Sequence, residues 1–203
     1  MMTLQSSDTD ILEEMDRIRV MYALKRTLRY QSVRDHSVHS ESVAEHLFAM
    51  NIITQYFLPL EDPASALDRI RIHELILFHE LGEIETGDIV FHLKNEEHRL
   101  EERRAALRVA ERLPDSLQGI ARARIHEFDT VDSPEAVFAD AIDKIEPIFE
   151  MYDESVLPAF KRLHITREMA VDGKRAATED FPYMRRFLDA WERRAVSLNV
   201  FPS

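Results

Sequence analysis

The chain has 203 residues, 45% of them hydrophobic, so it is long enough to bury the core of one domain. It carries 26 Lys and Arg against 38 Asp and Glu, and the net charge of −12 argues against a general affinity for duplex nucleic acid. No stretch approaches the ~20 apolar residues of a membrane span, and the polar, acidic segment 1–10 lacks the features of a secretory signal. We therefore expect one cytoplasmic domain over residues 1–203, without membrane contact.

The sequence contains no cysteine, which excludes disulfides and thiolate metal ligands. A metal site would then use His, Asp and Glu, a donor set that favours a hard or borderline divalent ion. Only four glycines occur, and apolar residues recur mostly at helical spacing. These features predict an all-α fold.

The first helix is expected over residues 11–29 and is followed by a polar loop over 30–40. Its apolar residues recur at near-helical spacing, which is typical of an amphipathic helix that covers the core. They are Ile11, Met15, Ile18, Tyr22 and Leu28.

A second helix is predicted to begin after Ser42, because Ser42 and Glu45 have the spacing of a capping box. The apolar pattern carries this helix to Phe57. Prolines in the segment 58–64 indicate a break before a third helix over 66–83.

Later helices are expected over 95–113, 117–128 and 135–152, with one or two outer helices between about 166 and 199. The helix over 95–113 has one apolar side, formed by Leu100, Leu107 and Ala110. The helix over 135–152 follows a Ser-Pro-Glu start signal, and its core stripe is Phe138, Ile142, Ile145 and Phe149.

The segment 78–88, Phe-His-Glu-Leu-Gly-Glu-Ile-Glu-Thr-Gly-Asp, brings a histidine and four carboxylates directly behind an apolar run. On a continuous helix His79 would point with the buried stripe, and Glu83 would follow one turn later on the same face. His46 also faces inward, one turn after Val43. Imidazoles and carboxylates are costly to bury together unless something pairs with them, and a metal ion is the usual partner.

Three segments, in this order, resemble the HD-domain metal-dependent phosphohydrolases, in particular the branch of the bacterial 5′-deoxynucleotidases. They are 41–46 (Glu-Ser-Val-Ala-Glu-His), 79–88, and 136–143 (Ala-Val-Phe-Ala-Asp-Ala-Ile-Asp). The resemblance covers about residues 18–152 and implies an all-helical fold and a homodimer. It also implies one divalent metal ion, whether Co, Mn, Mg, Zn or Fe.

The resemblance also assigns the metal ligands. The family's late motif places its aspartate five residues after the aromatic position occupied here by Phe138, which selects Asp143 rather than Asp140. The implied ligand set is His46, His79, Glu80 and Asp143.

Other site residues follow from the same resemblance. Glu83 matches the carboxylate that activates the attacking water, and Asp88 matches an acidic residue near the substrate sugar. The pair Arg29 and Tyr30, followed by Arg34, resembles the arginine–aromatic pair that contacts the nucleotide.

The chain departs from the family at Glu80, which replaces an aspartate, and at His39, where relatives often have arginine. The function predicted is a metal-dependent 5′-nucleotidase that releases phosphate from (deoxy)nucleoside monophosphates. Two alternatives stay open. One is a degenerate HD module that binds nucleotide or metal without turnover. The other is a dinuclear HD phosphodiesterase or oxygenase, with extra ligands drawn from His92, His98 or His126.

Overall fold

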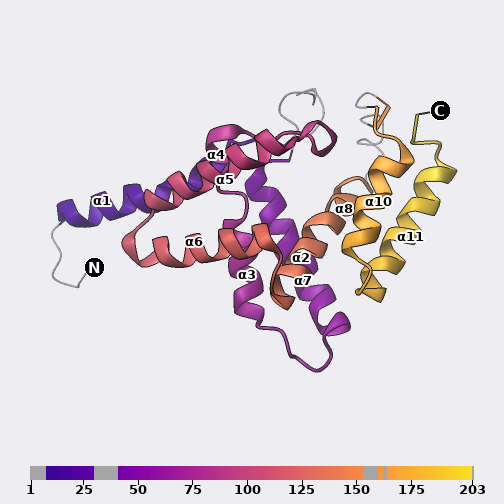
Figure 1. Cartoon of the computed structure of the whole chain (residues 1–203), viewed down its shortest axis with the longest axis horizontal. Coiled ribbons are helices and arrows are strands. Elements are labelled where there is room, and N and C mark those ends of the chain that lie inside the picture. Colours follow the sequence, from indigo (N-terminus) through magenta and orange to yellow (C-terminus); the bar gives the residue numbers. More distant parts are fainter. Residues whose placement is uncertain (1–7, 30–40, 153–159, 162–163, 203) are drawn as a thin grey trace.

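The computed structural model describes residues 8–29, 41–152, 160–161 and 164–202. These ranges are helical except for connecting turns and one isolated antiparallel bridge between Leu28 and Ser42, which confirms the all-α prediction (Figure 1). The elements in chain order are α1 (Asp8–Ile18), η1 (Arg19–Lys25), α2 (Val43–Glu61), α3 (Arg69–Phe78), α4 (Glu83–Thr86), η2 (Phe91–Leu93), α5 (Glu96–Glu111), α6 (Asp115–Thr130), α7 (Pro134–Ile145), α8 (Pro147–Glu150), α10 (Arg167–Ala177) and α11 (Pro182–Ser197).

Helices α2, α3 and α7 form the middle of the molecule. Helix α6 packs on α3 and α7, α5 packs on α6, and α10 and α11 cover the other side against α7 and α2 (Figure 1). One cluster of buried side chains runs through all of these elements. Its largest fully buried members include Phe57, Phe138 and Phe160. Segments far apart in the sequence therefore share one core, which fixes how α2, α3 and α7 face each other.

Helix α2 begins as predicted, with a complete capping box. The Ser42 side chain accepts from the Glu45 backbone N–H at 3.3 Å, and the Glu45 carboxylate accepts from the Ser42 N–H at 2.7 Å. The helix then continues past Phe57 to Glu61, with Pro59 inside its last turn. The break predicted at Leu58 therefore falls four residues later.

Helix α3 ends earlier than predicted. It begins after Asp68, whose side chain caps the N–H groups of Ile70 and Arg71, and it ends at Phe78 instead of Glu83. Residues 79–82 form a turn before the short helix α4. The prediction of one helix through Glu83 was wrong, and His79 and Glu80 lie in the turn that follows α3.

Two glycines make the turns on either side of α4 possible. A Cβ atom on Gly82 would lie 2.3 Å from the backbone oxygen of Glu102 in α5, closer than any van der Waals contact allows. Gly87 has a φ of 71°, in the region that side-chain-bearing residues avoid. Gly82 thus lets α5 approach the turn that carries Glu80.

The helix predicted over 135–152 is divided. The Ser133 side chain caps α7 by accepting from the Ala136 N–H at 3.0 Å, as the start signal predicted. Helix α7 ends at Ile145, and Pro147 begins α8, because a proline ring cannot continue the hydrogen-bond ladder. Phe149 is consequently more exposed, at 37%, than the other residues of its predicted stripe.

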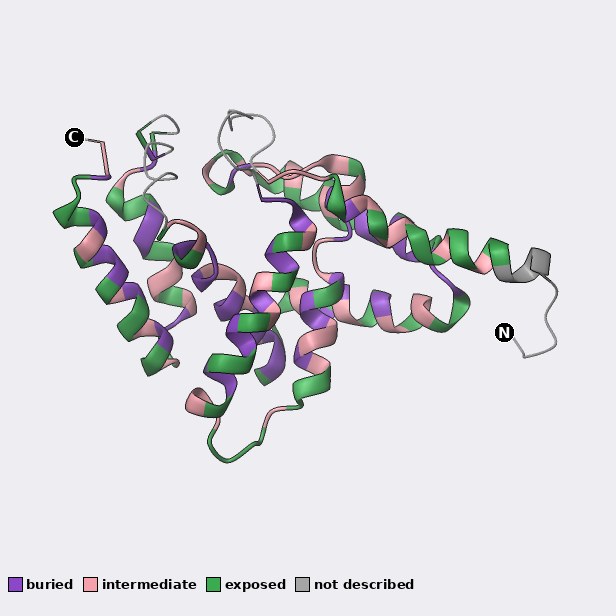
Figure 2. Ribbon diagram, turned by 180° about the vertical axis from the view of Figure 1, so that it is seen from behind, coloured by how far each residue is buried: buried purple, intermediate pink, exposed green. Residues whose placement is uncertain are grey.

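The prediction that the first helix covers the core holds only for its second half. Helix α1 ends at Ile18, and Leu24 in the following η1 is buried in the core. Helix α1 extends away from the body of the molecule, and its apolar face is mostly exposed (Figures 1 and 2). Leu12, Met15, Ile18 and Tyr22 are 45–60% exposed. In α5, likewise, Leu100 and Leu107 are exposed, and the core-facing side consists of Ala105, Ala106, Val109 and Ala110. In the described ranges no helix has the length and apolar content needed to cross a membrane.

Candidate metal centre

Four side chains predicted as metal ligands converge from three segments. His46 comes from α2, His79 and Glu80 from the turn after α3, and Asp143 from α7, and each offers a ligand atom within 4.8 Å of the others. The Nε2 atom of His46 lies 3.1 Å from Oδ1 of Asp143. The Nε2 atom of His79 lies 3.3 Å from Oε1 of Glu80 and 3.9 Å from Oδ1 of Asp143.

The orientation of His79 leaves one ring nitrogen for a ligand. Its Nδ1 lies 2.9 Å from the carbonyl oxygen of Ile76, so Nδ1 carries the hydrogen and donates it to that oxygen. Its ring also stacks on Phe128, with ring centroids 4.3 Å apart. The buried Nε2 makes no hydrogen bond of acceptable geometry to any described residue. A divalent ion between this nitrogen and the adjacent carboxylates would satisfy it, so the four residues fit a metal ion.

His46 is oriented by a carboxylate that the sequence did not reveal as functional. Its Nδ1 lies 2.8 Å from Oε2 of Glu146, and both side chains are buried. The guanidinium of Arg29 also lies 2.7 Å from this Nδ1. Because arginine cannot accept a hydrogen bond, Glu146 is the acceptor for a hydrogen carried on Nδ1. This leaves Nε2 of His46 facing Asp143, in the carboxylate–histidine arrangement typical of metal sites. The only sequence signal for Glu146 is its position three residues after Asp143.

Arg29 is held by carboxylates. Its Nη1 donates to Oε2 of Glu41 at 3.1 Å and to Oε2 of Glu146 at 3.2 Å. Burial, followed by the nearby charge of Glu146, raises the pKa of Glu41 to about 7, although Arg29 opposes this. Arg29 thus links Glu41 to Glu146, the carboxylate that contacts His46. Arg29 also lines the cavity described below.

The field of the cluster attracts a cation. Burial lowers the pKa of His79, but the negative charges of Glu80 and Asp143 outweigh burial and raise it to about 10. Burial raises the pKa of Glu80, but the charge of His79 outweighs it and holds the pKa below the usual range. The pKa of Asp143 is likewise held low, by Lys144 and the two imidazoles against burial. Without a metal, a proton on His79 offsets part of this negative charge.

Glu83 lies beside the four candidate ligands, together with Lys94 and Glu102. The sequence predicted a role for Glu83 but not for the other two. The side chain is buried at the start of α4, and burial together with the charges of Glu80 and Asp88 raises its pKa well above the usual value. The ammonium of Lys94 lies 4.0 Å from Oε1 of Glu83 and 2.6 Å from Oε2 of Glu102. No sequence pattern pointed to Lys94 or Glu102. The close packing of α5 at Gly82 brings Glu102 here, and Lys94 reaches the site from the segment before α5.

A cavity of about 550 Å³ opens over this cluster. His79, Glu80 and Asp143 line it, and so do Glu83 and Asp88. Asp140, which the late-motif register rejected as a ligand, also lines the cavity and pairs with Lys144 at 3.3 Å. The predicted Tyr30 and Arg34 lie outside the described residues. The extra ligands considered for a dinuclear site, His92, His98 and His126, neither line the cavity nor join a metal-type cluster within the described ranges.

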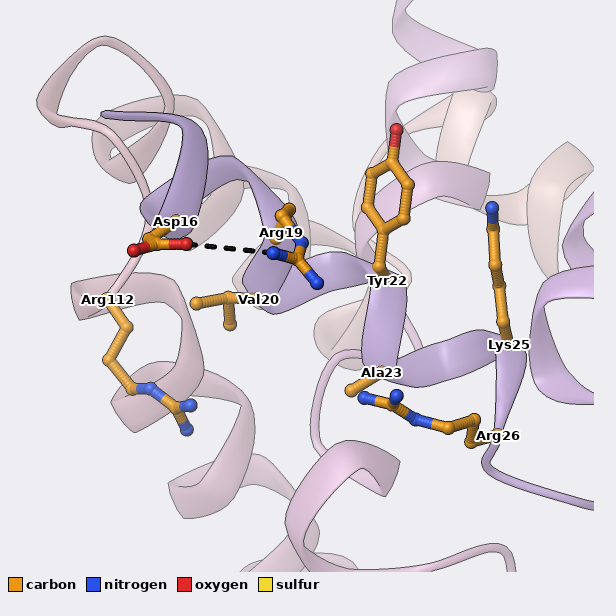
Figure 3. Close-up of a pocket in the computed structure, with 8 residues that line it drawn as sticks. All are labelled: Asp16, Arg19, Val20, Tyr22, Ala23, Lys25, Arg26 and Arg112. Atoms are coloured by element: carbon orange, nitrogen blue, oxygen red, sulfur yellow. Dashed lines mark ion pairs between the residues drawn. The ribbon is translucent and has the colours of Figure 1, made fainter. Parts of the chain in front are cut away.

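A second hollow, of about 530 Å³, lies on the surface beside η1 (Figure 3). Asp16 is the one carboxylate that lines it, and this side chain pairs with Arg19 at 3.8 Å. No histidine of the described ranges lines it, so those residues offer no ligand set like that of the first cavity. Its lining is Asp16, Arg19, Val20, Tyr22, Ala23, Lys25, Arg26 and Arg112.

The described residues thus form an all-helical fold in which two histidines and two carboxylates meet beneath a cavity, as a candidate His/acid metal centre. The sequence matches the HD domain family over residues 21–182. The chain belongs to this family, which confirms the resemblance found in the three motifs.

Curated relatives carry related names. The chain is 29% identical to 5′-deoxynucleotidase hdd1 of Schizosaccharomyces pombe over 119 residues, which cover 56% of this chain and 58% of that protein. It is 29% identical to 5′-deoxynucleotidase HDDC2 of Homo sapiens over 136 residues, 66% of this chain and 64% of that protein. The chain thus spans about three fifths of the length of these relatives.

Solved structures share the fold. A predicted metal-dependent phosphohydrolase from Magnetospirillum magnetotacticum MS-1 is 24% identical, with a TM-score of 0.77 over 95% of this chain and 96% of that one. A conserved hypothetical protein from Pyrococcus furiosus is 22% identical, with a TM-score of 0.63 over 88% and 99%. These likenesses concern the fold alone.

Proposed function

We propose that the protein is a metal-dependent phosphohydrolase that releases phosphate from (deoxy)nucleoside 5′-monophosphates. The observation that carries the proposal is the convergence of His46, His79, Glu80 and Asp143, with the orphaned Nε2 of His79, at a cavity that also contains Glu83. The names of the curated relatives support the same activity. From the family resemblance we also propose a homodimer that acts in the cytoplasm.

The metal ion would be held by His46, His79, Glu80 and Asp143. It would polarise a phosphoryl oxygen and make water more acidic. Glu146 and the Ile76 carbonyl fix the two imidazole rings through their Nδ1 hydrogens, so both Nε2 atoms point to the same place before the ion binds.

Glu83 is the proposed general base. Its raised pKa reflects burial and the charges of Glu80 and Asp88, and a carboxylate of this kind takes a proton more readily than one in water. Water attacks phosphorus as its proton passes to Glu83, the ester P–O bond breaks, and the departing sugar oxygen takes up that proton, which restores the Glu83 carboxylate. The products are a nucleoside and inorganic phosphate.

Asp88 is the proposed contact to the sugar, and Arg29 is a proposed contact to the nucleotide. Both line the cavity. Arg29 is bonded to Glu41 and Glu146, so its position is fixed before substrate binds. A fixed guanidinium loses little conformational entropy when it binds a phosphate.

The longer side chain of Glu80 does not argue for a degenerate module. Its carboxylate reaches the same cluster as the two histidines and Asp143. The chain around it therefore accommodates a glutamate where the family usually has an aspartate.

The test is phosphate release from a panel of nucleoside and deoxynucleoside monophosphates, with Mg, Mn, Co and Zn supplied in turn. Elemental analysis should find one divalent ion per chain. Glu83→Gln should lower the rate by about 10²- to 10⁴-fold with metal content unchanged. Glu85→Gln is the matched control, because Glu85 pairs on the surface with Arg108 at 2.9 Å. No phosphate release under any condition, or equal loss in both variants, would refute the proposal.

A further inference from the structure

The cavity over the metal centre contains several basic side chains, and nearly all are engaged by carboxylates. Arg103 pairs with Asp129 at 2.7 Å, and Arg99 reaches Glu96 at 4.0 Å. Lys94 is held by Glu102, and Arg29 by Glu41 and Glu146. Lys144 lies 2.6 Å from Asp143 and 3.3 Å from Asp140. These charges are already balanced by neighbours.

Lys174 is the exception among the described basic residues that line this cavity. It comes from the last turn of α10, which packs on α7, the helix that carries Asp143. Its ammonium makes no ion pair or side-chain hydrogen bond with a described residue. Burial, followed by the charge of Lys144, lowers its pKa to about 8, while the charge of Asp143 opposes this. At neutral pH Lys174 is still mostly protonated.

The positive charge of Lys174 is therefore not offset by an ion pair with a described residue. Two ammonium groups near each other repel, and Lys174 has no carboxylate of its own to offset that repulsion. The cavity lining nevertheless carries more carboxylates than basic side chains, and the whole chain has a net charge of −12. A dianionic substrate that approaches this surface needs a local cation besides the metal.

We propose that Lys174 binds the phosphate group of the substrate. This inference rests on the proposed function and deepens it: helix α10, which lies outside the three motif segments, supplies a charge for a phosphomonoester dianion. Lys174 donates from its ammonium to a phosphate oxygen while the histidines and carboxylates hold the metal. The ligand class is a compound with a terminal phosphate, because an unphosphorylated nucleoside offers no charge for this side chain to meet.

Lys174 is better suited to a test than Lys144. Removing Lys144 would release Asp143 and Asp140 and so disturb the metal centre itself. Removing Lys174 breaks no ion pair with a described residue, so its loss should act on the anion and leave the metal in place.

The experiment uses inorganic phosphate as the probe and isothermal titration calorimetry of the metal-loaded full chain as the readout. Lys174→Met should weaken phosphate binding roughly tenfold to a hundredfold, the range for a lost hydrogen bond between charged groups. Lys174→Arg should restore most of it. Lys25→Met is the matched control, since Lys25 lies in η1 over the ring of Tyr22, 4.3 Å from its centroid, and lines only the surface hollow. Metal content, measured by elemental analysis, should stay equal in all variants.

Kinetics provide a second readout. With a nucleoside monophosphate, Lys174→Met should raise KM, and the unphosphorylated nucleoside should inhibit wild type and variant equally. Equal phosphate affinity and equal KM in wild type and Lys174→Met would overturn the inference, and phosphate release by the wild type would then leave the proposed function standing. Phosphate binding that depends on Lys174, in a wild type that releases no phosphate from any nucleotide, would support the inference and refute the proposed function. Loss of metal from Lys174→Met would also overturn the inference, because the residue would then act on the metal centre.

Discussion

The Nδ1 atom of His46 lies 2.8 Å from Oε2 of Glu146, and the two side chains are 1% and 2% exposed. They come from α2 and from the junction between α7 and α8, 100 residues apart in the sequence. A buried carboxylate that accepts the Nδ1 hydrogen fixes both the ring plane and the tautomer, so that Nε2 is free to bind a metal. Glu146 therefore holds His46 in the orientation that a metal ligand would need.

Replacing Glu146 should weaken metal binding without removing a ligand. Glu146→Ala leaves the Nδ1 hydrogen of His46 without its acceptor and removes one of the carboxylates that hold Arg29. We expect metal affinity to fall about 10- to 100-fold, the usual effect of losing such a partner. Chelator-competition titration measures it, with the exposed Glu179→Ala as control. An unchanged affinity would show that His46 is oriented by other contacts.

Helix α7 carries two aspartates near the site, and substitutions can show which of them is the metal ligand. Asp143 lies 3.1 Å from Nε2 of His46, whereas Asp140 pairs with Lys144 at 3.3 Å. Asp143→Asn should abolish stoichiometric metal binding, and Asp140→Asn should spare most of it. Elemental analysis after metal addition is the measurement. Equal loss in the two variants would show that the register taken from Phe138 is wrong.

Local chemistry explains which parts of the fold were predictable. The capping box at Ser42 and the Ser133 cap gave correct helix starts, since each depends on residues within one turn. The end of α3 and the exposure of α1 were missed. Periodicity shows that one face of a helix is apolar. It does not show what covers that face, or at which residue packing against another helix ends the helix.

The same distinction applies to the site. His46, His79, Glu80 and Asp143 were found together because the family motifs preserve their order, although no local pattern brings α2 beside α7. Glu102, Glu146 and Lys174 lie outside those motifs. Only the packing of α5 on α4, the junction after α7, and the packing of α10 on α7 place them at the site.

Gly82 should be intolerant of any side chain, in contrast to Gly119. A Cβ on Gly82 would clash with the Glu102 backbone, and overpacking of this kind costs about 1–3 kcal/mol or more. A Cβ on the exposed Gly119 of α6 meets nothing within 4 Å, so Gly119→Ala should stabilise that helix by up to about 1 kcal/mol. Urea unfolding of both variants tests the opposite signs. If Gly82→Ala is neutral, α5 moves away from the turn at little cost.

Metal binding should strengthen as pH rises. The carboxylates raise the pKa of metal-free His79 to about 10 despite burial, so at neutral pH its imidazole holds a proton that a metal must displace. Affinity should therefore increase by up to about tenfold per pH unit for each proton released, until pH reaches the folded-state pKa. Calorimetry in buffers of different ionisation enthalpy counts the protons.

The metal-free protein should show the opposite trend in stability. Because the folded pKa of His79 lies above the unfolded value of about 6.5, its contribution to the free energy of unfolding is fully present below that pH and is lost as pH rises toward 10. Thermal unfolding of chelator-treated protein across this range measures the trend, with His79→Gln as the variant in which it disappears. A metal affinity independent of pH, together with flat apo stability, would mean that His79 is neutral before the metal arrives.

The last prediction concerns Glu80, where the chain departs from the usual ligand of its family. Oε1 of Glu80 lies 3.3 Å from Nε2 of His79, and its carboxylate belongs to the four-residue cluster. Metal–oxygen distances are fixed within a few tenths of an ångström, and an aspartate would shorten the reach by one methylene, about 1.5 Å. The turn that carries Glu80 is held by the contact of Gly82 with α5, so it cannot easily move to compensate.

Glu80→Asp should therefore weaken both metal binding and phosphate release, even though aspartate is the residue that the family resemblance implies at this position. The measurement is the initial rate on deoxynucleoside monophosphates at saturating metal, beside a metal titration, with Glu85→Asp as the surface control. A degenerate module predicts the reverse: an inactive wild type and a variant that gains turnover. The placement of His46, His79, Glu83 and Asp143 around Glu80 favours the first outcome, because the cluster closes around the longer side chain. An active Glu80→Asp beside an inactive wild type would overturn the enzyme proposal and leave a binding module in its place.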